Sequence, residues 1–304
     1  MKIAGVSMTY NDGYKIKEWR QHYLEYKQFL DVFVIVDNGS EKGYQELLKT
    51  TFPEAIIIYR KENGGCTAAY NEGIKYVLEN SDADAIAIIA NDIKVTSNCL
   101  PVMSEYLYSD KKLGIVSSAI LNINSDIIDN YGHCVKNFKV SYCNRGESIK
   151  NIKVMKKYTD LVSGGFTMAK REFYLRAGVQ DEALFMYCDE MDTMFKARKF
   201  GYKMGVIASE YAWHWHINSP SKGKRSSASR YLISRNRVYL AKKYTGLTLL
   251  FEQIIRGLIL TPFIHGIRFL KYRDCHELKD ALYSMVGVFH GLCGKMYTNK
   301  YTEF

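Results

Sequence analysis

Residues 82–95 read DADAIAIIANDIKV, and this stretch decides the fold that we predict. Its apolar run, residues 85–90, has the length and the isoleucine content of a buried strand in a parallel sheet. The run stops at Asn91 and Asp92, which therefore lie at the carboxyl end of that strand. Open α/β folds bind ligands at this edge of the sheet. Asp92 is thus either a ligand for a divalent cation that holds a diphosphate, or only the cap of a turn.

The chain before this stretch repeats one structural unit. We predict strands and helices in alternation, with strands at 2–9, 31–36 and 55–59 and helices at 15–29, 45–51 and 67–80. This alternation is typical of an α/β fold with a mostly parallel, Rossmann-like central sheet and helices on both faces. Residues 122–151 show no period and are expected to be irregular.

Two loops after predicted strands carry an Asp or Asn beside Gly, namely DNGS at 37–40 and NGG at 63–65. They are either tight turns, because Gly and Asn tolerate positive φ, or parts of a nucleotide pocket. In the second case Asp37 accepts a hydrogen bond from a base or ribose. The chain contains neither GxGxxG nor GxxxxGK[ST], which argues against a dinucleotide or P-loop site.

Residues 189–192 place three carboxylates at the start of a predicted helix: Asp189, Glu190 and Asp192. They either cap the helix and interact with its dipole, or form a catalytic group beside Phe185 and Tyr187, whose rings could stack on a sugar.

The stretch YAWHWHI at 211–217 reads as a strand. In a strand His214 and His216 point to one face and Trp213 and Trp215 to the other. Two histidines on one face are either core residues or contacts to a metal or phosphate.

The net charge of +10 is confined to the C-terminal part of the chain. Residues 222–304 contain 15 Lys and Arg against 5 Asp and Glu, so residues 1–221 are formally neutral. We therefore expect a neutral catalytic domain, 1–221, and a basic helical region, 222–304, that faces an anionic surface. The neutral charge of residues 1–221 argues against nucleic acid as a partner.

Residues 247–269 are strongly apolar but are interrupted by charged residues and a proline. We expect them to lie in a membrane interface rather than to span the bilayer. The alternative is that these helices pack on the catalytic domain or form a homodimer. Seven scattered cysteines and an N-terminus without signal-peptide layout favour the cytoplasm, with the chain peripheral on the inner face of the cell membrane.

In their order and spacing these motifs resemble those of the inverting family 2 glycosyltransferases, which have a GT-A fold. More narrowly they look like the rhamnosyltransferase-like branch that builds bacterial surface polysaccharides such as capsules. The resemblance covers most of the chain. It rests on VDNGS (36–40), NGGCTAAYNEG (63–73), IIANDIKV (88–95), SGGFTMAKREFYLRAGVQDEALFMYCDEMD (163–192), the His-Trp-His strand and Arg235-Asn236.

The resemblance implies transfer of a sugar, with inversion, from a nucleotide diphosphate sugar to a hydroxyl of a glycan or lipid-linked sugar. It implies Mn²⁺ or Mg²⁺ held by Asp92 with His216 or His214, and Glu190, or else Asp189, as the base. The implied donor residues are Thr9, Tyr10, Asn11, Asp37, Asn38, Asn63, Gly64, Asn71, Asn91 and Asp92. The implied sugar or acceptor residues are Gly164, Gly165, Asp181 and Tyr187.

Two positions depart from the family pattern. Ala90 stands where the family often has the first acid or amide of its DxD motif, so Asp92 alone supplies the carboxylate. The order Asp189-Glu190 reverses the usual Glu-Asp, in which the Asp is the base. These departures leave open an alternative, a catalytically inactive nucleotide-sugar-binding or scaffold protein of the same fold.

Overall fold

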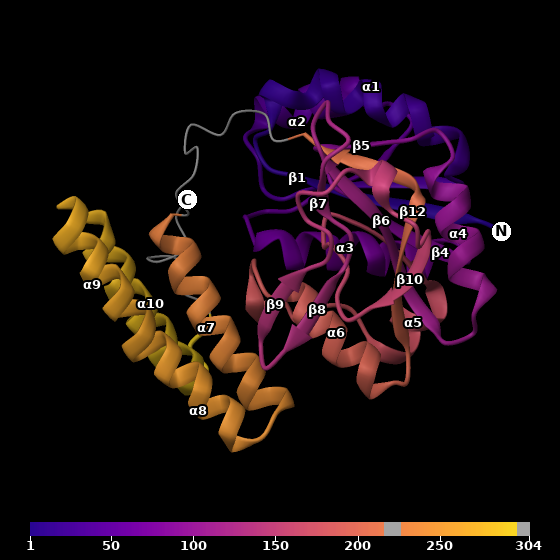
Figure 1. Cartoon of the computed structure of the whole chain (residues 1–304). Helices are drawn as coiled ribbons and strands as arrows, with labels where there is room; N and C mark the ends of the chain where they lie inside the picture. The colour runs from indigo at the N-terminus through magenta and orange to yellow at the C-terminus, as the bar shows by residue number, and fades with distance from the viewer. Residues whose placement is uncertain (216–225, 297–304) are drawn as a thin grey trace. The chain divides into compact units, whose positions relative to one another are not determined.

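Figure 1 shows the computed structural model, which describes residues 1–215 and 226–296. Internal contacts group residues 1–182 and 193–217 into one unit, and residues 183–192 and 218–304 into a second. The predicted boundary between residues 221 and 222 lies outside the described residues. The sequence assigns segment 183–192 to the catalytic domain, but this segment groups with the C-terminal helices. The reason is that side chains of one C-terminal helix donate hydrogen bonds to the backbone of the segment.

The first unit is built on four parallel strands in the order β4-β1-β2-β3. These strands are β1 (Ile3–Thr9), β2 (Val32–Asp37), β3 (Ile56–Tyr59) and β4 (Ala85–Ile89). All five residues of β4 are buried, as its unbroken apolar run predicts. The four predicted strands are confirmed, and their carboxyl ends meet at one edge.

Helices cover both faces of this sheet, with α1 and α2 on one side and α3 on the other (Figure 1). Alternate residues of β2 explain the two layers, because Phe33 and Ile35 share a core with α1, α2 and α4, whereas Val36 faces Gly73 of α3. The helices are α1 (Ile16–Tyr26), α2 (Lys42–Thr51), α3 (Gly65–Asn80) and α4 (Cys99–Ser109), and α1 lies between the 3₁₀ turns η1 (Gly13–Lys15) and η2 (Lys27–Phe29).

The other half of the sheet is mixed. Strand β11 runs antiparallel between β4 and β6, and β12 is parallel to β6 but antiparallel to β5 and β10. The strands are β5 (Ile93–Val95), β6 (Leu113–Asn122), β10 (Lys156–Thr159), β11 (Phe166–Lys170) and β12 (Lys203–His214). Helix α5 (Arg171–Ala177) follows β11.

The prediction that residues 122–151 are irregular is wrong. They contain β7 (Ile128–Asn130), which pairs with β6, and a hairpin of β8 (His133–Lys136) and β9 (Lys139–Tyr142), followed by the turn η3 (Ile149–Asn151). These strands have three or four residues each, too few for alternation to be read from the sequence.

The second unit is helical. Its helices are α7 (Ser227–Tyr244), α8 (Leu247–Ile255), the π-helical segment η5 (Arg256–Leu260), α9 (Thr261–Tyr272) and α10 (His276–Cys293). Helices α7 and α10 approach closely, because a Cβ at Gly287 or Gly291 would overlap the carbonyl oxygen of Tyr231 or Arg235. Gly294 does not pack in this way, since it ends α10 in the left-handed region with φ of 69°.

A buried polar cluster joins α7, α9 and α10. The Nδ1 atom of His265 lies 2.5 Å from Oε2 of Glu277, and the Ser227 hydroxyl donates to Asp280 at 2.7 Å. Arg230 also lies 3.5 Å from Asp280. Although these carboxylates and the histidine are close enough to share a metal ion, the Arg230 charge and the Ser227 hydroxyl already compensate the buried Asp280. The cluster therefore connects helices.

Residues Leu247–Tyr272 form one helix of 26 residues that, by length and composition alone, could cross a membrane. The expectation that residues 247–269 lie in the membrane interface rather than span the bilayer stays a prediction, because length and composition do not decide between the two. Only one side of it packs within the unit, through Gln253, Gly257 and His265. The other side exposes a row of apolar side chains: Leu247, Phe251, Ile255, Ile259, Phe263 and Ile267.

Candidate active site

Asp92 and His214 are brought together at the carboxyl end of β4. The Nε2 atom of His214, the last residue of β12, lies 3.2 Å from Oδ2 of Asp92. The backbone N–H of Trp215 donates to the Asp92 carbonyl at 2.7 Å, which fixes the two segments to each other. His216, the other predicted histidine ligand, lies outside the described residues.

These two side chains suit a divalent cation. Two neighbouring ligands of an octahedral ion, each about 2.1 Å from it, lie about 3.0 Å apart. The 3.2 Å between Asp92 and His214 fits this arrangement. Both side chains are partly open to solvent, with 23% and 30% of their surfaces exposed, so water or a phosphate oxygen could complete the coordination.

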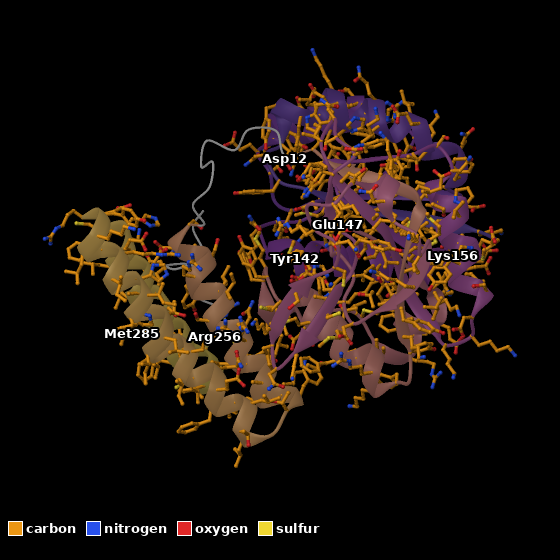
Figure 2. All side chains as sticks on the ribbon, in the orientation of Figure 1. Asp12, Tyr142, Glu147, Lys156, Arg256 and Met285 are labelled. Carbon is orange, nitrogen blue, oxygen red and sulfur yellow. The ribbon has the colours of Figure 1, made fainter. Side chains whose placement is uncertain are left out.

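Two further segments meet the end of β4. The side-chain amide of Asn91 donates to Asp12 Oδ2 at 2.7 Å, which ties this edge to the loop after β1 (Asp12 is labelled in Figure 2). The backbone N–H of Ala90 donates to the carbonyl of Gly165 at 2.8 Å. The predicted sugar-binding loop at Gly164 and Gly165 therefore lies beside Asp92. Asp181, the next predicted contact, is half-buried in the turn after α5.

Asp37, at the end of β2, is a buried carboxylate, and one of its oxygens lacks a hydrogen-bond partner among the described residues. Its Oδ2 atom accepts from the amide of Gln45 at 2.8 Å and from the N–H of Ser40 at 3.3 Å. Its Oδ1 atom has no hydrogen-bond partner among the described residues, and the side chain is fully buried. Because a buried acceptor without a partner is costly, this oxygen is suited to an N–H or O–H group of a bound ligand.

The loops after β2 and β3 are joined by reciprocal amide contacts. Asn38 donates to Oδ1 of Asn63 at 2.9 Å and accepts from the N–H of Gly64 at 3.2 Å. Gly39 has φ of 86°, and a Cβ there would lie 2.6 Å from the backbone carbon of Glu62. Only glycine fits this position. Asn38 thus serves mainly to hold the loops after β2 and β3 together next to Asp37.

The loop after β1 closes the same region. Asn11 accepts from the N–H of Glu41 at 3.0 Å and its own N–H donates to Ser40 at 2.9 Å. Thr9 is buried and its hydroxyl bonds the Tyr44 hydroxyl, whose pKa is raised above the ordinary tyrosine value chiefly by burial. Tyr10 is 43% exposed, so its ring is available to a ligand.

The Asn71 side chain is already engaged within the first unit. Its amide donates to the carbonyl of Gln180 at 2.8 Å and to Glu182 at 3.2 Å, and its oxygen accepts from the N–H of Gln180 at 3.0 Å. Asn71 therefore positions the turn that contains Asp181. A direct contact to a nucleotide sugar stays a prediction for this residue.

The segment before the acidic group has an unusual backbone. Phe185, Tyr187 and Cys188 all have positive φ, between 62° and 66°. Each such residue costs on the order of 1–3 kcal/mol and persists only where surrounding contacts hold it. Here the side-chain amide of Asn236, fully buried in α7, donates to the carbonyls of residues 184, 186 and 187 at 2.8–3.0 Å.

The neighbouring Arg235 is also fully buried and donates to the carbonyls of Ala183 and Leu184 at 3.1 and 2.8 Å. Tyr187 is held in addition by a hydroxyl contact of 2.9 Å to Ser229. The Arg235-Asn236 pair thus fixes the loop that leads from the turn η4 (Glu182–Leu184) into α6 (Asp189–Lys199).

The three carboxylates at the start of α6 have different surroundings. Asp192 is fully buried and accepts from the hydroxyl of Tyr244 at 2.6 Å and from Lys243 at 3.3 Å, so it anchors the helix. Asp189 is 8% exposed, and burial, followed by the charges of Glu190 and Asp192, holds the pKa of its carboxyl well above the ordinary value. Glu190 is half-buried. Raised pKa values of this kind are common in general acid–base sites.

Residues 8–176, more than half of the chain, match the model of the family described as Glycosyl transferase family 2. The chain belongs to this family. The matched range contains the strands that lead to Asp37 and Asp92 but ends before the acidic segment at residues 189–192. No curated protein matches its sequence.

Solved structures show the same fold at low sequence identity. The chain is similar to GalNAc-T7 with UDP, GalNAc and Mn²⁺ (TM-score 0.64, 14% identity, 96% of this chain and 56% of that one). It is also similar to the mannosyltransferase PcManGT from Pyrobaculum calidifontis with GDP-Man and Mn²⁺ (TM-score 0.56, 15% identity, 97% of this chain and 88% of that one). A third is S. aureus TarS 1–349 (TM-score 0.54, 11% identity, 98% and 93%).

The present chain spans just over half the length of the GalNAc-T7 chain. Together with the family match, these similarities confirm the predicted GT-A fold with additional C-terminal helices.

Several residues of the candidate site were not predicted. Asp12 accepts a hydrogen bond from Asn91, Gln45 donates one to Asp37, and the hydroxyl of Tyr44 bonds that of Thr9. Asp12 follows the first strand directly, a position that could have suggested it. Gln45 and Tyr44 lie within a helix, and nothing in their local sequence distinguishes them.

Proposed function

We propose that this chain transfers a hexosyl or rhamnosyl group from a nucleotide diphosphate sugar to an acceptor hydroxyl, with inversion at the anomeric carbon. The observation that carries the proposal is the placement of two acidic groups on one sheet edge. Asp37, whose Oδ1 has no partner among the described residues, is the last residue of β2, and the Asp92–His214 pair lies just beyond the end of β4. Family membership supports the same reaction class.

The spacing of these groups suits a nucleoside diphosphate. Strands β2 and β4 both pair with β1, so their ends are two strand spacings, or about 10 Å, apart. We assign the base or ribose to Asp37 and the diphosphate to Asp92. Tyr10, Asn11, Asn38, Asn63 and Gly64 would surround the nucleoside. The neighbours GalNAc-T7 and PcManGT contain UDP and GDP-Man, respectively.

Asp92 and His214 would hold Mn²⁺ or Mg²⁺, the former being the ion found in both of those neighbours. A divalent ion there stabilises the charge that develops on the leaving diphosphate. Because Ala90 contributes no ligand, the two side chains would depend on phosphate oxygens and water for the remaining positions.

We assign the general base to Glu190, with Asp189 as the alternative. In the transfer the acceptor oxygen forms a bond to the anomeric carbon while the bond from that carbon to the diphosphate oxygen breaks. The diphosphate leaves with the electron pair, and the acceptor proton passes to the carboxylate. Glu190 is the more accessible of the two side chains, which favours it for contact with an acceptor.

For the cellular setting we propose synthesis of a bacterial surface polysaccharide on the inner face of the cell membrane. Besides the exposed row on α8 and α9, helix α10 also exposes apolar side chains, at Leu278, Leu282, Met285 and Phe289 (Met285 is labelled in Figure 2). The basic excess lies in the same region. One-sided exposure favours insertion into the interface over a complete span, because Gln253, Gly257 and His265 on the other side are covered.

A donor screen tests the reaction. Purified full-length protein is assayed by thermal shift against UDP-, GDP- and dTDP-sugars with and without Mn²⁺, and then for donor hydrolysis. We expect one nucleotide class to stabilise the protein in the presence of the metal and to be hydrolysed slowly. The alternative, an inactive binding protein of the same fold, predicts stabilisation without hydrolysis or transfer. The anomeric configuration of the product, measured by NMR, decides whether transfer inverts.

A further inference from the structure

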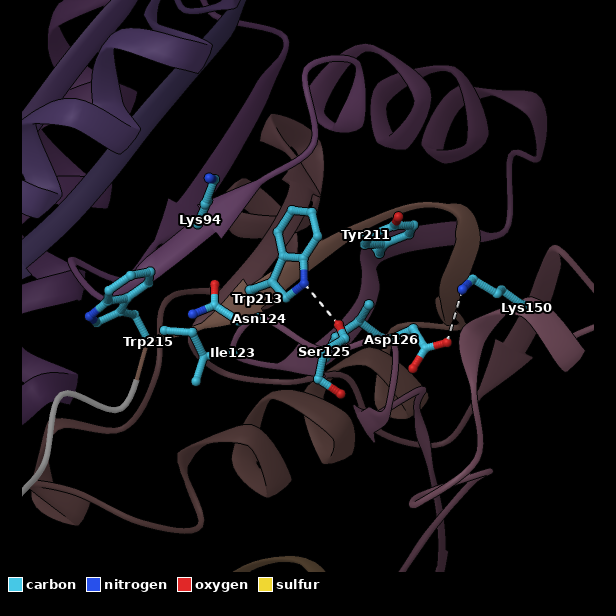
Figure 3. Close-up of a pocket in the computed structure, with 10 residues that line it drawn as sticks. Lys94, Ile123, Asn124, Ser125, Asp126, Lys150, Tyr211, Trp213 and Trp215 are labelled. Carbon is cyan, nitrogen blue, oxygen red and sulfur yellow. Dashed lines mark hydrogen bonds and ion pairs between the residues drawn. The ribbon is translucent and has the colours of Figure 1, made fainter.

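A cavity lies in the first unit, apart from the loops that we assign to the donor. It has a volume of about 650 Å³, within the range of about 300–1,000 Å³ typical of small-molecule sites. Figure 3 shows its lining, which combines three aromatic rings with several polar side chains. None of the predicted nucleotide-sugar residues lines it.

The aromatic wall comes from the end of β12. Tyr211 and Trp213 share one face of the strand, with ring centroids 5.1 Å apart, and Trp215 extends the wall. The indole N–H of Trp213 donates to the carbonyl of Ser125 at 3.1 Å (Figure 3), which fixes the ring. All three rings are only half-buried. Fixed, partly open aromatic faces suit the C–H surface of a pyranose ring, because the ring face carries the negative part of the aromatic quadrupole.

Polar groups surround these rings. Asp126 is held by the Ser148 hydroxyl at 2.8 Å and by Lys150 at 3.3 Å, and Asn124 lines the same cavity. The Lys94 ammonium lies 5.9 Å from the centroid of the Trp213 ring. Carboxylate, amide and ammonium groups around an aromatic platform can bond the hydroxyls of a sugar.

The cavity and the predicted metal site share two strands but use opposite faces of them. Trp213 pairs with Lys94, and His214 with Ile93, in the β12–β5 ladder. Since successive side chains of a strand alternate, His214 points to Asp92 while Trp213 points into the cavity. A sugar bound against Trp213 therefore cannot be the unit that reacts beside Asp92.

We propose that this cavity binds a non-reacting pyranose unit of the acceptor, so that the acceptor is an oligosaccharide or polysaccharide rather than a single sugar. The proposal rests on the transferase function given above and deepens it. Binding a remote unit would position the reacting hydroxyl, as remote binding energy does in other enzymes.

The test compares Trp213→Ala with Trp213→Phe and Lys94→Ala, and uses Tyr142→Ala as the control at an exposed aromatic residue outside the cavity. Each full-length protein is applied to a microarray of bacterial oligosaccharides and is assayed for donor hydrolysis. We expect wild type to bind oligosaccharides but not the matching monosaccharides. Trp213→Ala should bind at least about tenfold more weakly, with donor hydrolysis unchanged. Trp213→Phe should retain most binding, and Tyr142→Ala all of it.

Two outcomes overturn the proposal. One is wild-type binding that Trp213→Ala and Lys94→Ala leave unchanged, and the other is no oligosaccharide binding by wild type. If Trp213→Ala fails to fold, as judged by its melting temperature, the oligosaccharide binding of Lys94→Ala tests the proposal by itself. We expect this variant to bind more weakly than wild type. Donor hydrolysis reports separately on the transferase function, because its absence in wild type contradicts that function without affecting the array result.

Discussion

The Oδ2 atom of Asp92 and the Nε2 atom of His214 lie 3.2 Å apart, although 122 residues separate them in the chain. The contact forms because β5, which follows Asp92, pairs with the end of β12. It provides the two donor types, a carboxylate and an imidazole, that manganese-type ions accept, at the separation of neighbouring ligands.

Removal of the metal should abolish transfer. We expect EDTA to eliminate activity and Mn²⁺ or Mg²⁺ to restore it, and Asp92→Asn to lower kcat/KM by about 100-fold or more, because charge on the leaving diphosphate is no longer stabilised. Asp129→Asn, which alters an exposed ion pair with Arg145, is the matched control and should behave as wild type. Full activity in excess chelator would contradict the metal role.

Replacement of Glu190 by Gln should abolish transfer and preserve nucleotide binding. The change keeps the size of the side chain and removes its basicity, and a positioned general base contributes about 10²–10⁴-fold to the rate. Rates are measured with saturating donor, and nucleotide affinity is measured separately by calorimetry. Glu172→Gln, on α5, serves as control. An active Glu190→Gln together with an inactive Asp189→Asn would move the base to Asp189.

Asp37→Asn should weaken nucleotide binding by about 10- to 150-fold, since a hydrogen bond to a charged group is worth about 1.5–3 kcal/mol. The loss arises because Oδ1 of Asp37 is a buried acceptor without a partner among the described residues. Asp31→Asn makes the same change at the amino end of β2, where the carboxylate accepts from the N–H of Ile3. Nucleotide affinity in that variant should not change. Equal affinities for Asp37→Asn and wild type would remove Asp37 from the nucleoside site.

Asp189→Asn should raise the melting temperature at neutral pH but not in acid. The folded-state pKa of Asp189 is raised, so the folded chain binds this proton more tightly than the unfolded chain. The resulting stabilisation is complete below the unfolded pKa of about 3.9 and is lost as pH rises through the folded pKa. The substitution removes the buried charge that the folded chain must otherwise carry above its folded pKa, so its stabilising effect appears only on the alkaline side of that pKa.

The measurement for Asp189 is a series of melting curves from pH 4 to pH 8. The difference between variant and wild type should grow with pH. If the melting temperatures of variant and wild type differ by the same amount at every pH, the substitution does not act by removing a buried carboxylate charge.

The exposed row on α8 and α9 should hold the protein on anionic membranes. We expect co-sedimentation with phosphatidylglycerol vesicles at low salt, less at high salt, and less with phosphatidylcholine, because each basic residue near an anionic surface contributes about 1 kcal/mol. Phe251→Ser with Phe263→Ser should reduce binding, whereas Leu175→Ser, at an exposed leucine of the first unit, should not.

Two other outcomes of the membrane experiment are distinguishable. A protein that stays in the supernatant with all vesicles and elutes as a dimer, but becomes monomeric in the Phe251→Ser and Phe263→Ser variant, would assign the row to a homodimer. A protein in cell membranes that resists alkaline carbonate would show that Leu247–Tyr272 spans the bilayer, since carbonate releases peripheral proteins.

Much of the fold could be predicted because the relevant signals are local. The apolar run of β4 and the alternation of strands and helices up to residue 95 specify parallel strands, and the polar residues after each strand specify the edge at which ligands bind. The short strands β7, β8 and β9 escaped prediction because their pairing partners, rather than their own sequences, define them.

The sequence by itself determined where Asp37 and Asp92 lie, since Asp37 ends one strand and Asp92 closely follows another, and apolar residues specify the positions of both strands. Only the tertiary structure decided which distant groups join them. His214 reaches Asp92 through strand pairing, Asn236 holds the loop at residues 184–187, and Trp213 turns away from His214 into a separate cavity. The physical reason is that these contacts depend on strand order and helix packing, which bring together residues 50 to 122 positions apart, beyond the reach of any local pattern.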